Sequence, residues 1–348
     1  MTIRTLHVGL GPIGAAIARH AAEREGFRVA GAVDLDPAMT GRDAGEVIGL
    51  DRRLRVPVMD DLTRALVKSR AHIAVLCTSS SLERVMPDIE RILRARTALI
   101  STTEELAFPW HSHPRRAMLI DDWAKRARVA VLGTGVNPGF VMDALPVMLT
   151  GVCARVERLR IDRVQDARHR RLPFQQKIGA GLTEAEFEAR VKAGTVRHVG
   201  LTESIAMIAS ALGWRLGRIT DEIRPRLAQE PVESRDLAVG AGRVCGIIQD
   251  GTGYRGTDPV IRLHMEAYLG APESYESVDI VGEPNISMRI PTGVHGDIAT
   301  TAVVVNMIPR VLAAPPGLHT MLTLPLPSWS ARPRLPTAAV RGSRRRGR

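Results

Sequence analysis

The run Gly-Leu-Gly-Pro-Ile-Gly at residues 9–14 has the residue types and the spacing of a dinucleotide-binding turn. An apolar run precedes it, and a helix-like run, residues 15–18, follows it. Gly9 permits a tight turn, Gly11 lets the backbone approach a pyrophosphate, and Gly14 lets the helix pack against the strand. The N-terminus of such a helix faces the phosphates with unpaired N–H groups and a partial positive charge. The pattern therefore predicts a site for a nicotinamide dinucleotide.

A second apolar run, residues 28–33, ends in Asp34, which lies 20 positions after Gly14. A carboxylate at this place accepts a hydrogen bond from a ribose 2′-OH and repels a 2′-phosphate, which favours NAD. Arg42 is close enough in sequence to shield a 2′-phosphate if Asp34 turns away, although a solvated loop arginine is an equal interpretation. NAD and NADP are both left open, and the use of both is consistent with these residues.

Polar residues follow three further apolar runs, at the strand ends where a doubly wound sheet binds its ligands. Residues 77–80 supply hydroxyl groups that could line the nicotinamide ribose, or Ser80 or Ser81 could instead cap a helix. Residues 133–139 form a turn of Gly, Asn and Pro at the expected hinge between domains, and a plain interdomain link explains them equally well.

Two acids, Glu104 and Glu105, follow the remaining strand end beside Leu, Phe and Trp side chains. Burial there would raise a carboxyl pKa toward the range that is useful for proton transfer. The alternative is that both are first-turn acids of a short helix, where negative charge is favoured. The residues alone do not decide between these two interpretations.

The cofactor-binding residues predicted from these patterns are Gly9, Gly11, Pro12, Ile13, Gly14, Asp34, Arg42, Thr78, Ser79 and Thr102.

The first 140 residues alternate between expected strands and helices. The expected elements are 4–9, 13–24, 28–34, a helix near 60–69, 72–77, 82–95, 97–102, 118–127 and 129–133. The short strands lack polar alternation, which is typical of parallel strands that helices cover on both faces. We therefore predict an α/β fold with an N-terminal Rossmann-type, doubly wound parallel sheet over residues 1–140.

The pattern changes after Gly139 and predicts a C-terminal α+β domain with a mixed sheet, the substrate and dimerisation domain at residues 141–297. Residues 260–269 give the clearest strand, with apolar side chains on one face and Arg262, His264, Glu266 and Tyr268 on the other. Helices are expected at 184–193 and 202–213, with strand-like runs at 157–164, 216–226, 242–250 and 276–290. Asp297 is expected to cap an apolar helix, residues 298–313, within a C-terminal segment, residues 298–327.

Bulk composition excludes several classes of protein. Of the net charge of +11, seven arginines lie in residues 331–348, which leaves +4 for the rest. This basic tail, residues 328–348, is expected to be disordered, and a solvated extension is favoured over nucleic-acid contact. Three widely spaced cysteines argue against a disulfide framework or a zinc site and suit the cytoplasm. The longest apolar stretch, 298–314, contains Asn, Pro and Arg, so no membrane span is expected.

Several of these strings together resemble the 2,4-diaminopentanoate dehydrogenase family, which includes related NAD(P)-dependent amine dehydrogenases and shares the dihydrodipicolinate reductase-like fold. The resemblance covers about residues 3–327 and rests on the strings at 9–14, 41–49, 101–106, 170–179, 293–297 and 305–309. Several of these strings lie in the predicted second domain. The resemblance therefore extends beyond the dinucleotide-binding domain.

The resemblance implies reversible oxidative deamination of an amine to a ketone and ammonia, with a hydride passing to the nicotinamide. Glu104 falls on the family's essential carboxylate. It would take a proton from ammonium and stabilise an iminium cation. The polar pocket residues implied in the same way are Asn137, Arg163, Gln165 and His198, although Gln165 stands where asparagine is expected. The carboxylate of a 2,4-diaminopentanoate-like substrate could bind Arg163, Arg168, Arg170, Arg171 or Lys177, whereas a simple amine would need an apolar pocket.

Three other functions compete with this one. Dihydrodipicolinate reductase itself carries a paired-histidine segment with a following lysine and an Asp-Ala-Pro-Ser-Gly-Thr stretch, and neither is present here. An imine or carbonyl reductase of the same fold that needs no ammonia, or a dinucleotide-binding regulator whose tail binds nucleic acid, remain the alternatives. Exposed edges of the second sheet also predict a homodimer.

Overall fold

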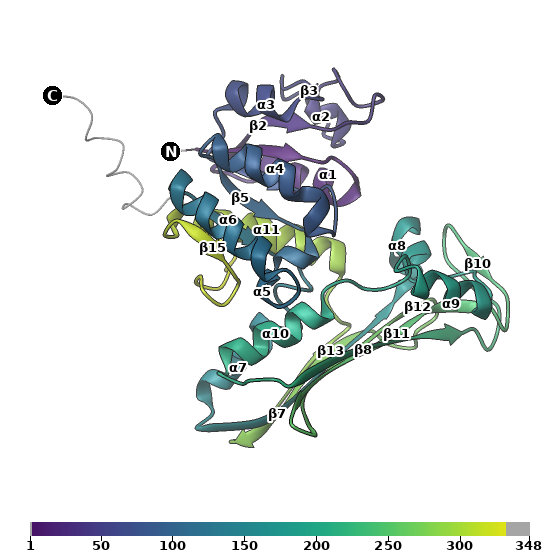
Figure 1. The fold of residues 1–348 in the computed structure, drawn as a ribbon. Coiled ribbons are helices and arrows are strands. Elements are labelled where there is room, and N and C mark those ends of the chain that lie inside the picture. Colours follow the sequence, from purple (N-terminus) through teal and green to yellow (C-terminus); the bar gives the residue numbers. More distant parts are fainter. Residues whose placement is uncertain (1, 332–348) are drawn as a thin grey trace. The chain divides into compact units, whose positions relative to one another are not determined.

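The computed structural model describes residues 2–331, and the chain forms two compact units. The first unit contains the residues up to Phe140 and those from Gly296 onward, and the second contains Val141–His295 (Figure 1). The part of the predicted basic tail from residue 332 onward lies outside the described residues.

The first unit is built on a seven-stranded sheet in which all neighbouring strands are parallel, in the order β15-β6-β5-β4-β1-β2-β3. The strands are β1 (Ile3–Val8), β2 (Phe27–Val33), β3 (Val58–Met59), β4 (Ile73–Leu76), β5 (Ala98–Ser101), β6 (Ala130–Gly133) and β15 (Gly317–His319). Every residue of β4, β5 and β6 is buried, because helices cover both faces. The predicted doubly wound parallel sheet is confirmed. Its strand order reverses between β2 and β4 on either side of β1, which is where such sheets bind their ligands.

The helices of the first unit divide between the two faces of the sheet. They are α1 (Pro12–Glu23), α2 (Ala44–Val47), α3 (Leu62–Ser69), α4 (Leu82–Arg94), α5 (Pro109–Ser112), α6 (Pro114–Ala127) and α11 (Gly296–Ala313), with the 3-10 turn η1 (Glu104–Leu106). Apolar side chains of α3, α4 and α6 share one core with the central strands, whereas α1 and α11 pack against each other. The chain thus returns from the second unit to complete the first.

Helix α11 is long and apolar enough to cross a membrane by length and composition alone. It continues through Pro309 and ends at Ala313, as the predicted apolar helix does. Its apolar residues Val304, Val305 and Ile308 are nevertheless fully buried, and the helix packs against α1, β5 and β6. This is the position of a core helix of a doubly wound domain. The helix begins at Gly296, so Asp297 lies in its first turn and not at the N-cap position expected for it.

The second unit is built on a six-stranded mixed sheet in the order β14-β13-β7-β12-β11-β8, in which only β7 and β12 run parallel. The strands are β7 (Arg155–Asp166), β8 (Arg218–Leu227), β11 (Val244–Arg255), β12 (Asp258–Tyr268), β13 (Tyr275–Glu283) and β14 (Ile286–Pro291), beside a small hairpin of β9 (Val232–Glu233) and β10 (Ala238–Val239). The predicted mixed sheet is confirmed. Its edge strands are β14 and β8, and a homodimer formed through them stays a prediction.

Strand β12 shows how the second sheet is divided into two faces. Ile261, Leu263 and Met265 are fully buried on one face, as the alternation predicts. The helix that packs against β12, β11 and β8 is α10 (Leu201–Ala211). Tyr268 differs from the prediction, because it is buried on the polar face with the guanidinium of Arg226 4.9 Å from its ring centroid. The shorter helices are α7 (Ala144–Leu149), α8 (Leu172–Lys177) and α9 (Glu184–Lys192), with the 3-10 turns η2 (Thr150–Val152) and η3 (Ala167–His169).

His7 is a polar side chain at the centre of the parallel sheet. It lies in β1, is 1% exposed, and has its Nε2 atom 3.0 Å from the hydroxyl of Thr5. Burial disfavours the charged imidazolium and lowers the pKa of His7 from 6.5 to about 4. The native state therefore holds a neutral histidine that the unfolded chain would protonate below pH 6.5.

We expect the first unit to lose stability as the pH falls from 6.5 toward 4. Because the native pKa of His7 is depressed, its contribution is complete above pH 6.5 and is lost as protons bind the unfolded chain. The loss from this group is about 2–3 kcal/mol of unfolding free energy at pH 4.5. Urea unfolding at pH 7 and 4.5 measures it, and the His7→Leu variant should show a smaller difference. The exposed His111→Gln serves as the control, and an equal effect of the two substitutions would refute this assignment.

Candidate active site

The glycine-rich turn between β1 and α1 has three distinct glycine environments. Gly9 has a φ of +86° and donates its N–H to the carbonyl of Val33 at 2.9 Å. A Cβ atom at Gly14 would lie 1.9 Å from the carbonyl oxygen of Gly9, so the helix packs on the turn as predicted. A Cβ atom at Gly11 would meet nothing within 4 Å. Open space therefore adjoins the backbone of Gly11. Helix α1 begins directly after it, with Pro12 and Ile13.

Asp34 follows β2 and is bonded to this turn. Its Oδ2 accepts a hydrogen bond from the N–H of Leu10 at 2.6 Å, and its Oδ1 accepts one from the N–H of Asp36 at 2.9 Å. A carboxylate has about four lone-pair positions, so these two bonds leave capacity for a ribose hydroxyl. Asp34 thus braces the glycine-rich turn as well as lying where a ribose is expected.

Arg42 lies at the exit of the loop that begins at Asp34. It is exposed, and its Nη1 donates to the carbonyl of Ala38 at 3.4 Å. The next residue, Asp43, accepts bonds from the N–H groups of Gly45, Leu54 and Val56. Burial raises the pKa of Asp43, but these backbone donors outweigh it and lower the pKa below its ordinary value. Asp43 therefore fixes the loop on which Arg42 stands, a role that the sequence analysis missed.

The hydroxyl residues after β4 do not cap the helix that follows them. Ser81 occupies the N-cap position of α4, but its side chain makes no capping bond. The N–H of Leu82 instead donates to Oε2 of Glu105 at 2.7 Å. The predicted N-cap position at Ser81 is therefore confirmed, but Glu105 and not a serine hydroxyl makes the capping bond. Thr78 is exposed, and the hydroxyl of Ser79 accepts a bond from the N–H of Ser81 at 3.1 Å.

The two acids after β5 have different surroundings. Both lie in η1, as the first-turn interpretation predicts. Glu105 caps α4 and also faces Nε2 of His113 at 3.2 Å, which gives it a structural role. Glu104 lies near the end of β4, where its charge acts on the thiol of Cys77. Burial raises the pKa of that thiol to about 11, with Thr102 hydrogen bonds opposing the rise and the negative charge of Glu104 adding to it.

The turn of residues 133–139 is buried and braced within the first unit. Asn137 is 7% exposed, and its bond to Pro138 is cis. The N–H of Val136 donates to the hydroxyl of Thr300 at 3.2 Å, which ties the turn to α11. The boundary between the two units follows directly after this turn, at Phe140.

The first unit thus brings most of the predicted cofactor residues, with Glu104 and Asn137, to the carboxyl-end edge of one parallel sheet. They follow β1, β2, β4, β5 and β6 in turn, and Arg42 stands further out on the loop after β2. The bare backbone at Gly11 and the N-terminus of α1 fit the pyrophosphate of a dinucleotide. Among residues 2–331, no group of three or more His, Cys, Asp or Glu side chains could hold a metal ion.

The other predicted pocket residues lie in the second unit, where Arg163 and Gln165 of β7 take part in a polar network. Arg163 is 2% exposed and its Nη1 lies 2.5 Å from Oε1 of Glu276. Its Nη2 donates to the carbonyl of Val294 at 3.1 Å, and Nε2 of Gln165 donates to the same oxygen at 3.2 Å. Oε1 of Gln165 in turn accepts a bond from Nη1 of Arg170 at 3.0 Å.

His198 lies in a positive field within the same unit. Burial, with a smaller contribution from nearby cationic side chains, lowers the pKa of its imidazole from 6.5 to about 3. Those cations are Lys177, Arg163, Arg170 and Arg197. The buried amide of Gln249 holds the backbone of His198, since it accepts from the N–H at 2.8 Å and donates to the carbonyl at 3.0 Å. His198 is therefore neutral at physiological pH and surrounded by positive charge.

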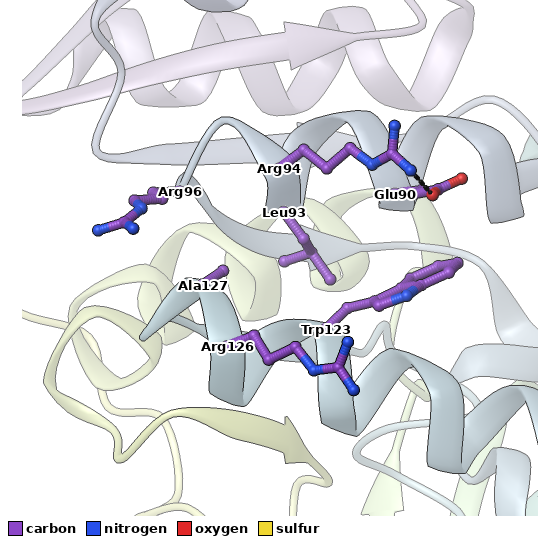
Figure 2. A pocket seen from close by; sticks show the side chains of 7 residues that line it. All are labelled: Glu90, Leu93, Arg94, Arg96, Trp123, Arg126 and Ala127. Carbon is purple, nitrogen blue, oxygen red and sulfur yellow. Dashed lines mark ion pairs between the residues drawn. The ribbon is translucent and has the colours of Figure 1, made fainter.

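A separate hollow of about 300 Å³ opens between α4 and α6 of the first unit. Figure 2 shows that Arg94, Arg96, Arg126 and Trp123 line this hollow. Arg94 is paired to Glu90 at 2.6 Å. Arg126 is paired to Asp122 at 2.8 Å, and both helices end here, where helix dipoles disfavour anions. None of the predicted site residues lines this hollow, so it is distinct from the strand-end site.

The comparisons with known proteins agree with this architecture. The family model of the 2,4-diaminopentanoate dehydrogenase C-terminal domain matches residues 140–332. A 2,4-diaminopentanoate dehydrogenase from Acetoanaerobium sticklandii is 34% identical over 93% of this chain and 94% of its own length. An amine dehydrogenase from Streptomyces virginiae is 25% identical over 93% of this chain and 96% of its own.

Solved structures show the same fold. An amine dehydrogenase from Mycobacterium smegmatis superposes with a TM-score of 0.86 at 24% identity, covering 95% of this chain and 98% of that one. A dihydrodipicolinate reductase from Paenisporosarcina sp. TG-14 gives a TM-score of 0.53 at 14% identity, covering 93% and 99%. Fold and relatives together define an oxidoreductase with a Rossmann-type domain and a second, mixed-sheet domain. The chain belongs to the 2,4-diaminopentanoate dehydrogenase family.

Proposed function

We propose that this protein is an NAD(P)-dependent amine dehydrogenase whose substrate carries a carboxylate, as 2,4-diaminopentanoate does. An ammonium form R₂CH–NH₃⁺, the oxidised cofactor and water give the ketone, ammonium, the reduced cofactor and one proton, and the reaction is reversible. The 34% identity to a 2,4-diaminopentanoate dehydrogenase along nearly the whole chain supports the reaction. The cationic side chains near His198 support a substrate that carries a carboxylate.

The cofactor site proposed is the glycine-rich turn with Asp34, and the residues Thr78, Ser79 and Thr102 at the ends of β4 and β5. When bound, a nicotinamide dinucleotide supplies the atom that accepts or returns the hydride. Asp34 favours the 2′-hydroxyl of NAD, and the exposed Arg42 supports a 2′-phosphate, so we propose that both cofactors are used.

Glu104 is proposed as the residue that moves the proton. Toward the amine, its carboxylate takes a proton from ammonium and so releases nucleophilic ammonia beside the ketone. The same carboxylate then stabilises the iminium cation that accepts the hydride. Its place next to the end of β4, near Cys77, supports this role, since strands β4 and β5 both end at the cofactor edge of the sheet.

The substrate carboxylate is proposed to bind near Arg170 and Lys177. Burial is the main cause of the lowered pKa of His198, and the cations Lys177, Arg163, Arg170 and Arg197 add to it. Only this smaller, cationic contribution favours an anion at the same place. Of the five cationic candidates, Arg168 is exposed and paired with Asp166 at 2.7 Å. Arg163 is buried against Glu276, and Arg171 is not among the cations that lower the pKa of His198. Arg170 and Lys177 are therefore the candidates that we propose for the substrate carboxylate.

We expect oxidation of NADH or NADPH with 2-amino-4-oxopentanoate to require ammonium at alkaline pH. In the reverse direction, kcat/KM for 2,4-diaminopentanoate should exceed that for 2,4-diaminopentane, in which a methyl group replaces the carboxylate. The difference should be about 10- to 100-fold, because a charge-assisted contact contributes about 1.5–3 kcal/mol. Steady-state absorbance of the reduced cofactor measures both.

Two outcomes would contradict the proposal. Oxidation of the reduced cofactor at an unchanged rate without ammonium would favour an imine or carbonyl reductase of the same fold. Equal kcat/KM for the two amines would favour a simple amine as substrate and would remove the carboxylate site while leaving the reaction in place.

A further inference from the structure

Glu276 is a buried acid that none of the proposed steps uses. It lies in β13 directly opposite Arg163 of β7 in the register of the sheet, and both side chains are 3% exposed. Its Oε1 faces Nη1 of Arg163 at 2.5 Å and also accepts the N–H of Val294 at 3.2 Å. Burying two charges in this way is costly unless each is paired, so the geometry at this point is tightly specified.

From Glu276 the hydrogen bonds continue in one direction. The carbonyl of Val294 accepts bonds from Nη2 of Arg163 at 3.1 Å and from Nε2 of Gln165 at 3.2 Å. Oε1 of Gln165 accepts a bond from Nη1 of Arg170 at 3.0 Å, and that guanidinium lies 4.1 Å from the ring centroid of Phe174. Both backbone groups of Val294 are therefore held, and the hydrogen bonds connect this segment to Arg170.

The segment that these bonds hold would not keep its shape by itself. Thr292 and Gly293 both have positive φ angles, 70° and 66°, and a threonine in this region is strained. Such a backbone persists only where the surroundings fix it. The orientation of the Gln165 amide depends on this segment, because its Nε2 donates to the carbonyl of Val294.

We propose that Glu276 is a positioning residue that fixes Arg170 for recognition of the substrate carboxylate, by way of Arg163, Val294 and Gln165. This inference rests on the proposed function, in which Arg170 binds that carboxylate. It gives Arg163 an internal role as the link between Glu276 and Val294 and not that of a substrate ligand. The charge of Glu276 compensates the buried guanidinium of Arg163, and the length of the Glu276 side chain sets the position of Val294.

The test compares two substitutions that separate length from charge. Glu276→Asp keeps the charge but is one methylene too short to reach both Arg163 and Val294. We expect it to raise KM for 2,4-diaminopentanoate roughly tenfold, as is usual for coupled neighbours, with kcat and the KM for 2,4-diaminopentane little changed. Glu276→Gln keeps an acceptor oxygen at full length, so its effect on the ratio of the two KM values should be smaller.

Asp279→Glu is the matched control. It makes a one-methylene change with the charge kept, on the same strand but on the opposite face, because residues 276 and 279 differ by an odd number. Thermal unfolding of all variants shows which of them are merely destabilised. A destabilised protein with a purely structural Glu276 would lose activity on both amines alike, and that result would overturn the proposal. So would a change of the KM ratio in Glu276→Gln without one in Glu276→Asp.

A second pair of variants separates this inference from the function on which it rests. Arg170→Gln should abolish the preference for the carboxylate, and adding Glu276→Asp to it should not change the ratio further. If Arg170→Gln removes the preference but Glu276→Asp alone does not weaken it, the positioning role of Glu276 is wrong and the carboxylate site stands. If Arg170→Gln leaves the preference intact, both fail, while ammonium-dependent turnover would still support the dehydrogenase.

Discussion

Replacement of Glu104 by glutamine is expected to lower kcat for amine oxidation by about 10²–10⁴-fold, the usual contribution of a positioned acid–base group. The amide has the shape of the carboxylate but can neither take the proton from ammonium nor stabilise an iminium cation by its charge. The glycine-rich turn and Asp34 are untouched, so the dissociation constant for NADPH should not change. Steady-state turnover and fluorescence titration of the cofactor measure the two quantities separately.

Glu105→Gln is the matched control for this substitution. It makes the same chemical change one residue away, where the carboxylate caps α4 through Leu82 and faces His113. We expect about 0.3–1 kcal/mol less unfolding free energy, from the lost charge at the helix N-terminus, and near-normal turnover. If Glu104→Gln turns over normally, or if Glu105→Gln is the variant that loses kcat, the assignment of the proton-transfer role to Glu104 is wrong.

The fold was predictable where a local pattern extends over enough residues. The fully apolar runs that became β4, β5 and β6 predicted a parallel sheet, and the alternation in β12 predicted one buried face. Strands β3 and β15 have only two and three residues, too few for any periodicity, and were missed. Residues 276–290 read as one strand-like run but form β13 and β14, because the pattern does not mark the turn between them.

The residues of the candidate site were likewise predictable only where they belong to a local sequence pattern. The glycine-rich turn and the Glu104–Glu105 pair lie within short stretches, so their residue types and spacing were informative. Glu276 and Gln249 carry no local signal, since each is a single polar residue in an otherwise ordinary strand. Glu276 becomes significant only because the register of β13 and β7 sets it opposite Arg163. Gln249 becomes significant only because β11 runs beside the backbone of His198.

The second large effect expected is the loss of cofactor binding in Gly11→Ala without loss of the fold. Gly11 has φ −56° and ψ 177°, a conformation that alanine adopts without strain, and a Cβ atom there meets nothing within 4 Å. The methyl group would instead occupy the space that we assign to the pyrophosphate. Overpacking of this kind costs about 1–3 kcal/mol, which is roughly a 5- to 150-fold rise in Kd. Titration with NADH and NADPH measures this, and the melting temperature should be unchanged.

Gly14→Ala provides the opposite case within the same turn. Its Cβ atom would lie 1.9 Å from the carbonyl oxygen of Gly9, and a backbone atom in a buried turn cannot move aside without disturbing β1 and α1. This variant should therefore lose stability by several kcal/mol, with weaker cofactor binding as a consequence of that loss. If Gly11→Ala bound NADH and NADPH normally, the dinucleotide would have to approach the sheet elsewhere. If both variants melted early, Gly11 would be packed against protein, and the space beside it would not be the pyrophosphate site.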